Sequence, residues 1–261
     1  MRFDRMSGLD AEQLDELEER VAALLGKPWE SGTGRPRELT LREAIIVSSG
    51  YTRQNIIEDV WAEIFDTSQP TISRIITEIT PLVEKATAEF RPAAEEAKVT
   101  VRGQTVLVDG FLAPCWSWRG VQDLWSGKHK TTGFNSQVIS DLAGQVIFIS
   151  EPVTGHNHDM TALSETETAE VIATAFSSIG DKGYQGSGYI TPIKKIQGRE
   201  LLEWEKEFNA DVSRLRAPVE RAIAHIKSWR ILHTDYRRPL RTYLTSFRAA
   251  IGLYFFKLAC E

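Results

Sequence analysis

Three acidic residues have the spacing of a site that could bind a metal ion. Asp109 follows the apolar run Val106–Val108, and Asp181 comes just after the run Phe176–Ile179, so both acids are predicted at strand ends. If these strands are parallel neighbours, the two carboxylates meet at one edge of a sheet, where Glu220 on a predicted helix can lean over them. Carboxylate oxygens are the ligands that Mg²⁺ prefers. The pattern predicts an Asp/Asp/Glu metal site for phosphodiester chemistry with two ions.

Each acid also has a plainer interpretation. The dipeptide at 109–110 is Asp-Gly and the tripeptide at 181–183 is Asp-Lys-Gly, and both are typical of turns. A glutamate on a helix, such as Glu220, is commonly a solvated surface residue.

Helical spacing places two cations beside the glutamate. Arg216 precedes Glu220 by four residues and Lys227 follows it by seven, so all three are predicted on one helix face, where the cations can bind phosphate beside a metal. The alternative is an intrahelical salt-bridge ladder, worth a few tenths of a kcal/mol per pair.

The elements that would position these residues form an α/β order. The N-terminal third is predicted to be helical, with capping boxes that begin at Asp10 and Thr40. We expect an all-α region over residues 1–95 and an α/β domain over residues 96–261. Strands are expected at 105–108, 134–140, 146–150 and 176–179, with a further strand at 189–193. The helices are expected at 41–49, 54–65, 68–85, 160–173, 199–209, 213–229 and 240–258.

Residues 58–75 have the spacing of a helix-turn-helix. Ala62 allows a close helix crossing, Ile72 fills the core ten residues later, and Asp66 must adopt a left-handed conformation at the turn. In a DNA major groove, the start of the second helix would present four residues, namely Ser68, Gln69, Thr71 and Arg74. The alternative is a plain helical hairpin.

Several other residues have two interpretations. Asp159, with His156 and His158 nearby, resembles a metal cluster, but we expect it to be an N-cap. Lys128 and Lys130 are candidate contacts to the DNA backbone. The tryptophans are expected in the core, with base stacking as the alternative, and they are Trp116, Trp118 and Trp125.

Composition narrows the class of protein. Residues 1–180 carry 16 Lys and Arg against 27 Asp and Glu, whereas residues 181–261 carry 15 against 9, so the C-terminal third is basic and has charge that suits phosphate contacts. Cys115 and Cys260 predict neither a zinc site nor a disulfide framework. No apolar run reaches the ~18 residues of a membrane span, so we expect a cytoplasmic, soluble protein.

Five segments together resemble the bacterial insertion-sequence transposases of the DDE superfamily. They surround Asp109, residues 126–138, Asp159, Asp181 and Glu220, and they read VLVDGFLAPCWSW, SGKHKTTGFNSQV, PVTGHNHDM, IGDKGYQG and RLRAPVERAIAHIKSWRIL. The resemblance extends to the N-terminal helices, where such proteins carry a helix-turn-helix. The short interval before Glu220 resembles the version with no large inserted domain. Ser213 stands where the family's signature has a tyrosine.

The resemblance implies an RNase H-like catalytic domain, a mixed central sheet flanked by helices. It implies Asp109, Asp181 and Glu220 as catalytic residues that bind Mg²⁺, with Mn²⁺ as a substitute. The expected partners are double-stranded DNA, as element ends and target, and further copies of the chain in a homodimer or larger synaptic assembly. The expected location is the bacterial cytoplasm, at the nucleoid when DNA is bound. Two alternatives remain, a catalytically inactive DNA-binding regulator and a host-adopted endonuclease that does not join strands.

Overall fold

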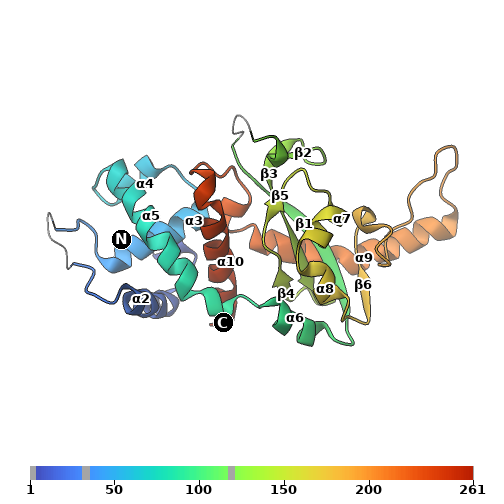
Figure 1. Cartoon of the computed structure of the whole chain (residues 1–261), viewed down its shortest axis with the longest axis horizontal. Helices are drawn as coiled ribbons and strands as arrows, with labels where there is room; N and C mark the ends of the chain where they lie inside the picture. The colour runs from blue at the N-terminus through green and yellow to red at the C-terminus, as the bar shows by residue number, and fades with distance from the viewer. Residues whose placement is uncertain (1–3, 31–35, 117–120, 261) are drawn as a thin grey trace. The chain divides into compact units, whose positions relative to one another are not determined.

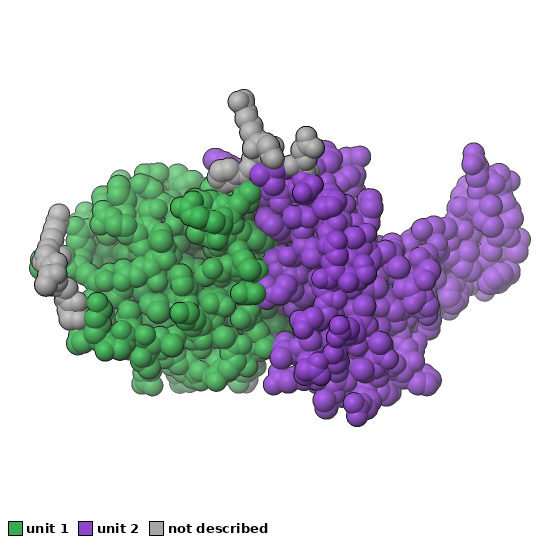
Figure 2. Space-filling view, viewed as in Figure 1, with its two compact units in different colours: residues 1–91, 227–261 green, residues 92–226 purple. Residues whose placement is uncertain are grey.

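The computed structural model describes residues 4–30, 36–116 and 121–260, which fall into two units (Figures 1 and 2). Unit 1 comprises residues 1–91 and 227–261, and unit 2 comprises residues 92–226. The second expected domain, 96–261, therefore differs from the structure. The last 35 residues join the N-terminal helices because α10 (Tyr243–Ala259) is apolar along most of its length and packs on α5 (Gln69–Ala86) and α3 (Leu41–Gln54).

The elements described in unit 1 are all helices. Its remaining elements are α1 (Asp4–Ser7), α2 (Ala11–Leu25), α4 (Glu58–Ile64), η1 (Ala88–Phe90), η4 (Arg230–Leu232) and η5 (Leu240–Thr242). Both predicted capping boxes are confirmed: the side chain of Asp10 begins α2 and that of Thr40 begins α3. Ile45, Ile72 and Phe256 are fully buried between the helices. None of the described helices has the length and apolarity that a membrane crossing requires.

Unit 2 is built on a mixed sheet. Its strands are β1 (Thr105–Pro114), β2 (Trp125–Ser126), β3 (Thr131–Ser140), β4 (Val146–Ile149), β5 (Val153–Thr154) and β6 (Ser177–Ile179). The central path is β2-β3-β1-β6, with β4 and β5 also paired to β3. β3 is antiparallel to β1, whereas β6 is parallel to β1. This order makes the chain a mixed α/β protein, as the sequence predicted.

Helices cover the sheet of unit 2 (Figure 1). They are α6 (Ala94–Val101), α7 (Asp159–Glu165), α8 (Thr168–Ile172) and α9 (Glu203–Ile226), with η2 (Gln122–Leu124) and η3 (Lys182–Tyr184). Val106 and Val108 point into the core that α6, α7 and α8 close. Successive strand residues face opposite sides. Leu107 and Asp109 therefore point to the other side, where α9 crosses β1, β3 and β6.

The parallel pairing of β1 and β6 brings the first two acids together. Leu107 lies opposite Ile179, and Asp109 and Asp181 each come two residues further along the chain. The condition under which the sequence placed the two acids together, that these strands are parallel neighbours, is met. One detail was wrong: Asp109 does not end its strand, because β1 continues to Pro114 through its pairing with β3.

Other boundaries also differ from the predictions. One helix was expected over 160–173, but α7 and α8 are separate. Two helices were expected over 199–209 and 213–229, but α9 is continuous and its Pro218 lies inside it. The strand expected at 189–193 is reduced to one bridge, between Ile190 and Ile179. These boundaries depend on tertiary packing, which overrides local propensity.

The packing of α10 in unit 1 can be tested at Gly252. A Cβ there would come closer to the side chain of Thr87 than real Cβ atoms do, so we expect Gly252→Ala to destabilise the protein by about 1–3 kcal/mol in urea denaturation. Gly127→Ala is the matched control, because no atom lies within 4 Å of a Cβ there. Equal stability of the two variants would contradict this packing.

Candidate functional site

Asp109 is held from two sides at the edge of the sheet in unit 2. The NH2 group of Arg216, on α9, lies 2.8 Å from its Oδ2 atom, and the backbone N–H of Gly110 donates to its Oδ1 atom at 2.9 Å. Only 16% of the Asp109 side chain and 12% of the Arg216 side chain are exposed. The pair is therefore shielded from water, where a charge-assisted hydrogen bond is strong.

The pKa of Asp109 is raised above its ordinary value. Burial is the main cause, and the nearby charge of Asp181 adds to it. The positive charges of Arg216 and Lys128 oppose the increase. The ionised carboxylate at this position therefore depends on cations nearby.

Asp181 begins η3 immediately beside this pair. Its Oδ1 atom accepts a hydrogen bond from the backbone N–H of Gly183 at 2.6 Å, which fixes the orientation of the carboxylate. Its Oδ2 atom lies 3.8 Å from the Nζ atom of Lys128. The turn interpretation of Asp181 is thus confirmed, and its carboxylate also lies near Lys128.

Glu220 reaches the site through Arg216. The NH1 group of Arg216 lies 3.7 Å from Oε1 of Glu220, one helical turn along α9, and 58% of the Glu220 side chain is exposed. Arg216 therefore links Asp109 to Glu220. The expected position of Lys227 on the same helix face was wrong, because α9 ends at Ile226 and Lys227 belongs to unit 1.

Four residues of the site were assigned otherwise from the sequence or missed. Lys128 was expected on DNA, but its Nζ atom binds Oδ2 of Asp159 at 2.7 Å. Asp159 was expected to cap α7, but His158 is the N-cap and Asp159 is the first helical residue, its carboxylate turned to Lys128. Tyr184 and Gln137 are buried beside them, and the tyrosine hydroxyl donates to Oε1 of Gln137.

Two signals in the sequence could have identified these residues. Asn135 and Gln137 are polar residues at alternate positions of a predicted strand, and polar side chains that a strand buries require a specific partner. Tyr184 follows Asp181 by one turn of η3. Burial raises the pKa of Tyr184 well above its ordinary value, and the charges of Asp159, Asp109 and Asp181 raise it further, so its hydroxyl stays a hydrogen-bond donor.

The donor chemistry of this cluster suits a hard divalent cation, although its present arrangement is incomplete. Within the described residues, no three His, Cys, Asp or Glu side chains are placed to hold a metal ion by themselves. Arg216 and Lys128 lie against the carboxylates and supply positive charge. The carboxylate atoms available to an ion are oxygens, as Mg²⁺ requires. Carboxylate oxygens of Asp159 come close to both Gly110 and Gly183, where a larger residue would have no room.

The α4–α5 helix pair of unit 1 carries the other predicted site. Asp66 has a φ of +49°, which confirms its left-handed conformation, and Ala62 and Ile72 are buried. Ser68 and Arg74 are exposed, whereas Thr71 is half-buried and its hydroxyl lies 3.0 Å from that of Ser68.

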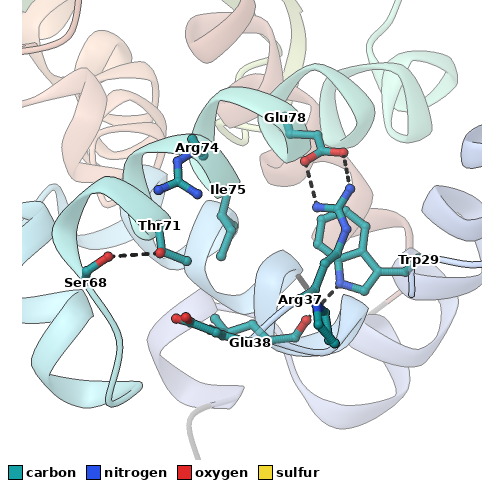
Figure 3. Close-up of a pocket in the computed structure, with 10 residues that line it drawn as sticks. Trp29, Arg37, Glu38, Ser68, Thr71, Arg74, Ile75 and Glu78 are labelled. Carbon is teal, nitrogen blue, oxygen red and sulfur yellow. Dashed lines mark hydrogen bonds and ion pairs between the residues drawn. The ribbon is translucent and has the colours of Figure 1, made fainter. Parts of the chain in front are cut away.

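The exposed start of α5 borders an open hollow (Figure 3). Ser68, Thr71 and Arg74 line one side of it. On the other side, Arg37 lies over the ring of Trp29 and binds Glu78 through two hydrogen bonds of 2.8 Å. Gln69 is less available than expected, since its amide binds Glu58.

The remaining candidates have mixed outcomes. Lys130 is exposed on the turn that follows β2. Trp116 and Trp125 were expected in the core but are 54% and 50% exposed, and Trp118 lies outside the described residues. Cys115 and Cys260 are free thiols, as expected.

Carboxylates gathered at the edge of a mixed sheet suit the binding of divalent ions for phosphodiester chemistry. The model of the family described as DDE superfamily endonuclease matches residues 108–254, so the chain belongs to that family. The matched residues include Asp109, Asp181 and Glu220.

Two curated proteins are similar to this chain. One, named as a transposase for insertion sequence element IS112 of Streptomyces albus G, is 28% identical over 201 residues, which cover 76% of this chain and 73% of that protein. The other, named as a transposase for insertion sequence element IS702 of Microchaete diplosiphon, is 26% identical over 270 residues, which cover 100% of this chain and 95% of that protein. No solved structure matches the chain.

The Asp109–Arg216 pair can be tested by Arg216→Met. Losing a shielded partner charge costs about 3 kcal/mol, whereas the surface pair of Arg214 and Asp211, 79% and 58% exposed, is worth under ~1 kcal/mol. We therefore expect Arg216→Met to lower the free energy of unfolding in EDTA at neutral pH, and Arg214→Met to leave it almost unchanged.

The ionisation of Asp109 determines how the stability loss of Arg216→Met depends on pH. Without Arg216 its pKa rises further, and a carboxyl group with a raised pKa in the folded state destabilises the fold only when it is ionised. The deficit of Arg216→Met should therefore shrink as the pH falls towards about 4. A deficit that grows on acidification would contradict this assignment.

Proposed function

We propose that this chain is a DNA transposase that cuts the ends of its element and joins the freed 3′-hydroxyl to target DNA, both at the site of Asp109, Asp181 and Glu220. The register of β1 and β6 carries this proposal, because it brings the first two acids side by side while α9 presents the third residue over them. Family membership and the two similar transposases support the same reaction class.

Asp109 and Asp181 would hold Mg²⁺ or Mn²⁺, with Glu220 completing the ligand set and two ions as the expected number. Bound metal supplies water activation and charge stabilisation of the leaving oxygen. Arg216 orients the Asp109 carboxylate and keeps its charge balanced before substrate arrives. For Glu220 to join the metal, its contact with Arg216 must open, and the exposure of its side chain leaves room for that change.

We further propose that unit 2 has the RNase H-like fold and that the α4–α5 pair is a helix-turn-helix. The antiparallel β1–β3 pair, the parallel β6 strand and the helices on both faces support the first assignment. The left-handed Asp66 and the exposed Ser68 and Arg74 support the second. Unit 1 would then bind element ends, with residues 227–261 as part of its core.

Exposed basic side chains and exposed aromatic rings would both contribute to DNA binding. Arg74 and Lys130 have no ion-pair partner among the described residues and suit phosphate contacts. The exposed rings of Trp116 and Trp125 suit stacking on unpaired bases. A homodimer or larger assembly, located in the cytoplasm and at the nucleoid, is the expected working form because two element ends must be processed together.

The reaction can be tested with DNA that carries the element's own ends. We expect Asp109→Asn, Asp181→Asn and Glu220→Gln each to reduce nicking and joining at least about a thousandfold, since each would remove several kcal/mol of metal-mediated stabilisation. Binding of the ends in a gel-shift assay should persist. Glu207→Gln, an exposed change on the same helix, should keep full activity.

The alternatives make different predictions in this assay. Nicking without joining would identify a simple endonuclease, and end binding with neither reaction, even in the unmodified protein, would identify a regulator. Either result would contradict the proposed transposase. Activity in EDTA equal to that in Mg²⁺ would contradict the proposed metal dependence of the reaction.

The DNA-binding face can be tested at Arg74. If it contacts a phosphate, Arg74→Ala should weaken binding of the element's ends and reduce the slope of log K against log salt by about one. Lys85→Ala, near the other end of α5, should change neither quantity. An unchanged slope in Arg74→Ala would exclude this face as the contact.

A further inference from the structure

Asp159 is a buried carboxylate in the first turn of α7 that does not cap the helix. It is the first residue of α7, where no side-chain capping bond forms, and it is only 7% exposed. Burying a carboxylate is costly unless cations or donors surround it. The burial of Asp159 therefore has to be explained by the groups around its carboxylate.

Asp159 and Asp181 form a close carboxylate pair. Oδ2 of Asp159 and Oδ1 of Asp181 both lie within 2.7 Å of the point that a Cβ on Gly183 would occupy. Oδ1 of Asp159 also lies 3.2 Å from the corresponding point at Gly110. A Cβ at Gly183 would collide with both acids, and one at Gly110 would crowd Asp159, so the glycines allow the carboxylates to come this close to the backbone.

Lys128 already places a cation against this pair. Its Nζ atom lies 2.7 Å from Oδ2 of Asp159 and 3.8 Å from Oδ2 of Asp181. The Lys128 side chain is 46% exposed and long, so the ammonium group can leave without rearranging the core. Lys128 therefore forms a close ion pair with Asp159 that can open towards solvent.

An unsatisfied donor points into the same space. Nε2 of Gln137 is fully buried and has no hydrogen-bond partner among the described residues, while Tyr184 fixes the opposite atom of the amide. This nitrogen lies 2.9 Å from the Cβ point of Gly110, which Asp159 also borders. A buried donor without a partner costs about 1–3 kcal/mol. An oxygen of a hydrated cation or of a phosphate would satisfy it.

We propose that Asp159 is a fourth acidic ligand of the metal site, paired with Asp181, and that Lys128 is a resident cation that a divalent ion displaces. The proposal rests on the proposed function, because it takes Asp181 as a metal ligand. Lys128 stabilises the acids before metal binds and competes with the metal for them. Once displaced, its ammonium group is free to contact phosphate.

The test is a titration of the full chain with Mn²⁺ in the absence of DNA, with free Mn²⁺ measured by electron paramagnetic resonance. Lys128→Met removes the competing charge and should raise Mn²⁺ affinity about tenfold or more. Asp159→Asn/Lys128→Met should bind about tenfold more weakly than Lys128→Met, because a ligand is lost. Lys194→Met, an exposed change of the same charge, should match the unmodified protein.

Each part of the proposal can fail separately. Equal or weaker binding by Lys128→Met would overturn the competition, and equal binding by the double variant and Lys128→Met would overturn Asp159 as a ligand. Thermal melting without metal checks that every variant is folded. If the unmodified protein binds Mn²⁺ and cuts DNA, but all variants bind Mn²⁺ with the same affinity, the roles proposed for Asp159 and Lys128 fail while the proposed function stands. If neither the unmodified protein nor Lys128→Met binds Mn²⁺, the proposed metal site fails with it.

Discussion

The hydrogen-bond register between β1 and β6 is the constraint on which the site depends. Leu107 lies opposite Ile179, and this single alignment places Asp109 and Asp181 next to one another although 71 residues separate them in the sequence. A shift by one residue would turn one of the two carboxylates to the other side of the sheet. The buried face of β1 resists such a shift of this strand, because Val106 and Val108 would then leave the core.

Gathering carboxylates at one edge of a sheet has an electrostatic cost, and the chain offsets it with cations from two directions. Arg216 reaches Asp109 from α9, and Lys128 reaches Asp159 and Asp181 from the turn after β2. Arg216 is almost covered, whereas Lys128 is half exposed. The two cations therefore suit different tasks: Arg216 fixes the geometry of a ligand, and Lys128 can exchange with another cation.

The sequence predicted those parts of the molecule that local patterns determine. The capping boxes at Asp10 and Thr40, the left-handed Asp66 and the existence of strands before the two aspartates follow from short-range rules, whereas the parallel pairing of those strands does not. Long-range packing decided the rest. The assignment of residues 227–261 to unit 1, the continuity of α9 and the role of Lys128 depend on contacts between distant segments, and no local spacing encodes them.

Asp159 illustrates the same limit at one residue. A polar residue before a predicted helix is typical of an N-cap, yet a shift of one position puts it inside the helix and turns its carboxylate to Lys128. The most direct test of the central claim is the anomalous scattering of crystals soaked in Mn²⁺. The account predicts a peak at about 2.0–2.3 Å from carboxylate oxygens of both Asp109 and Asp181. Manganese bound only elsewhere, with both of these carboxylates uncoordinated at saturating metal, would contradict it.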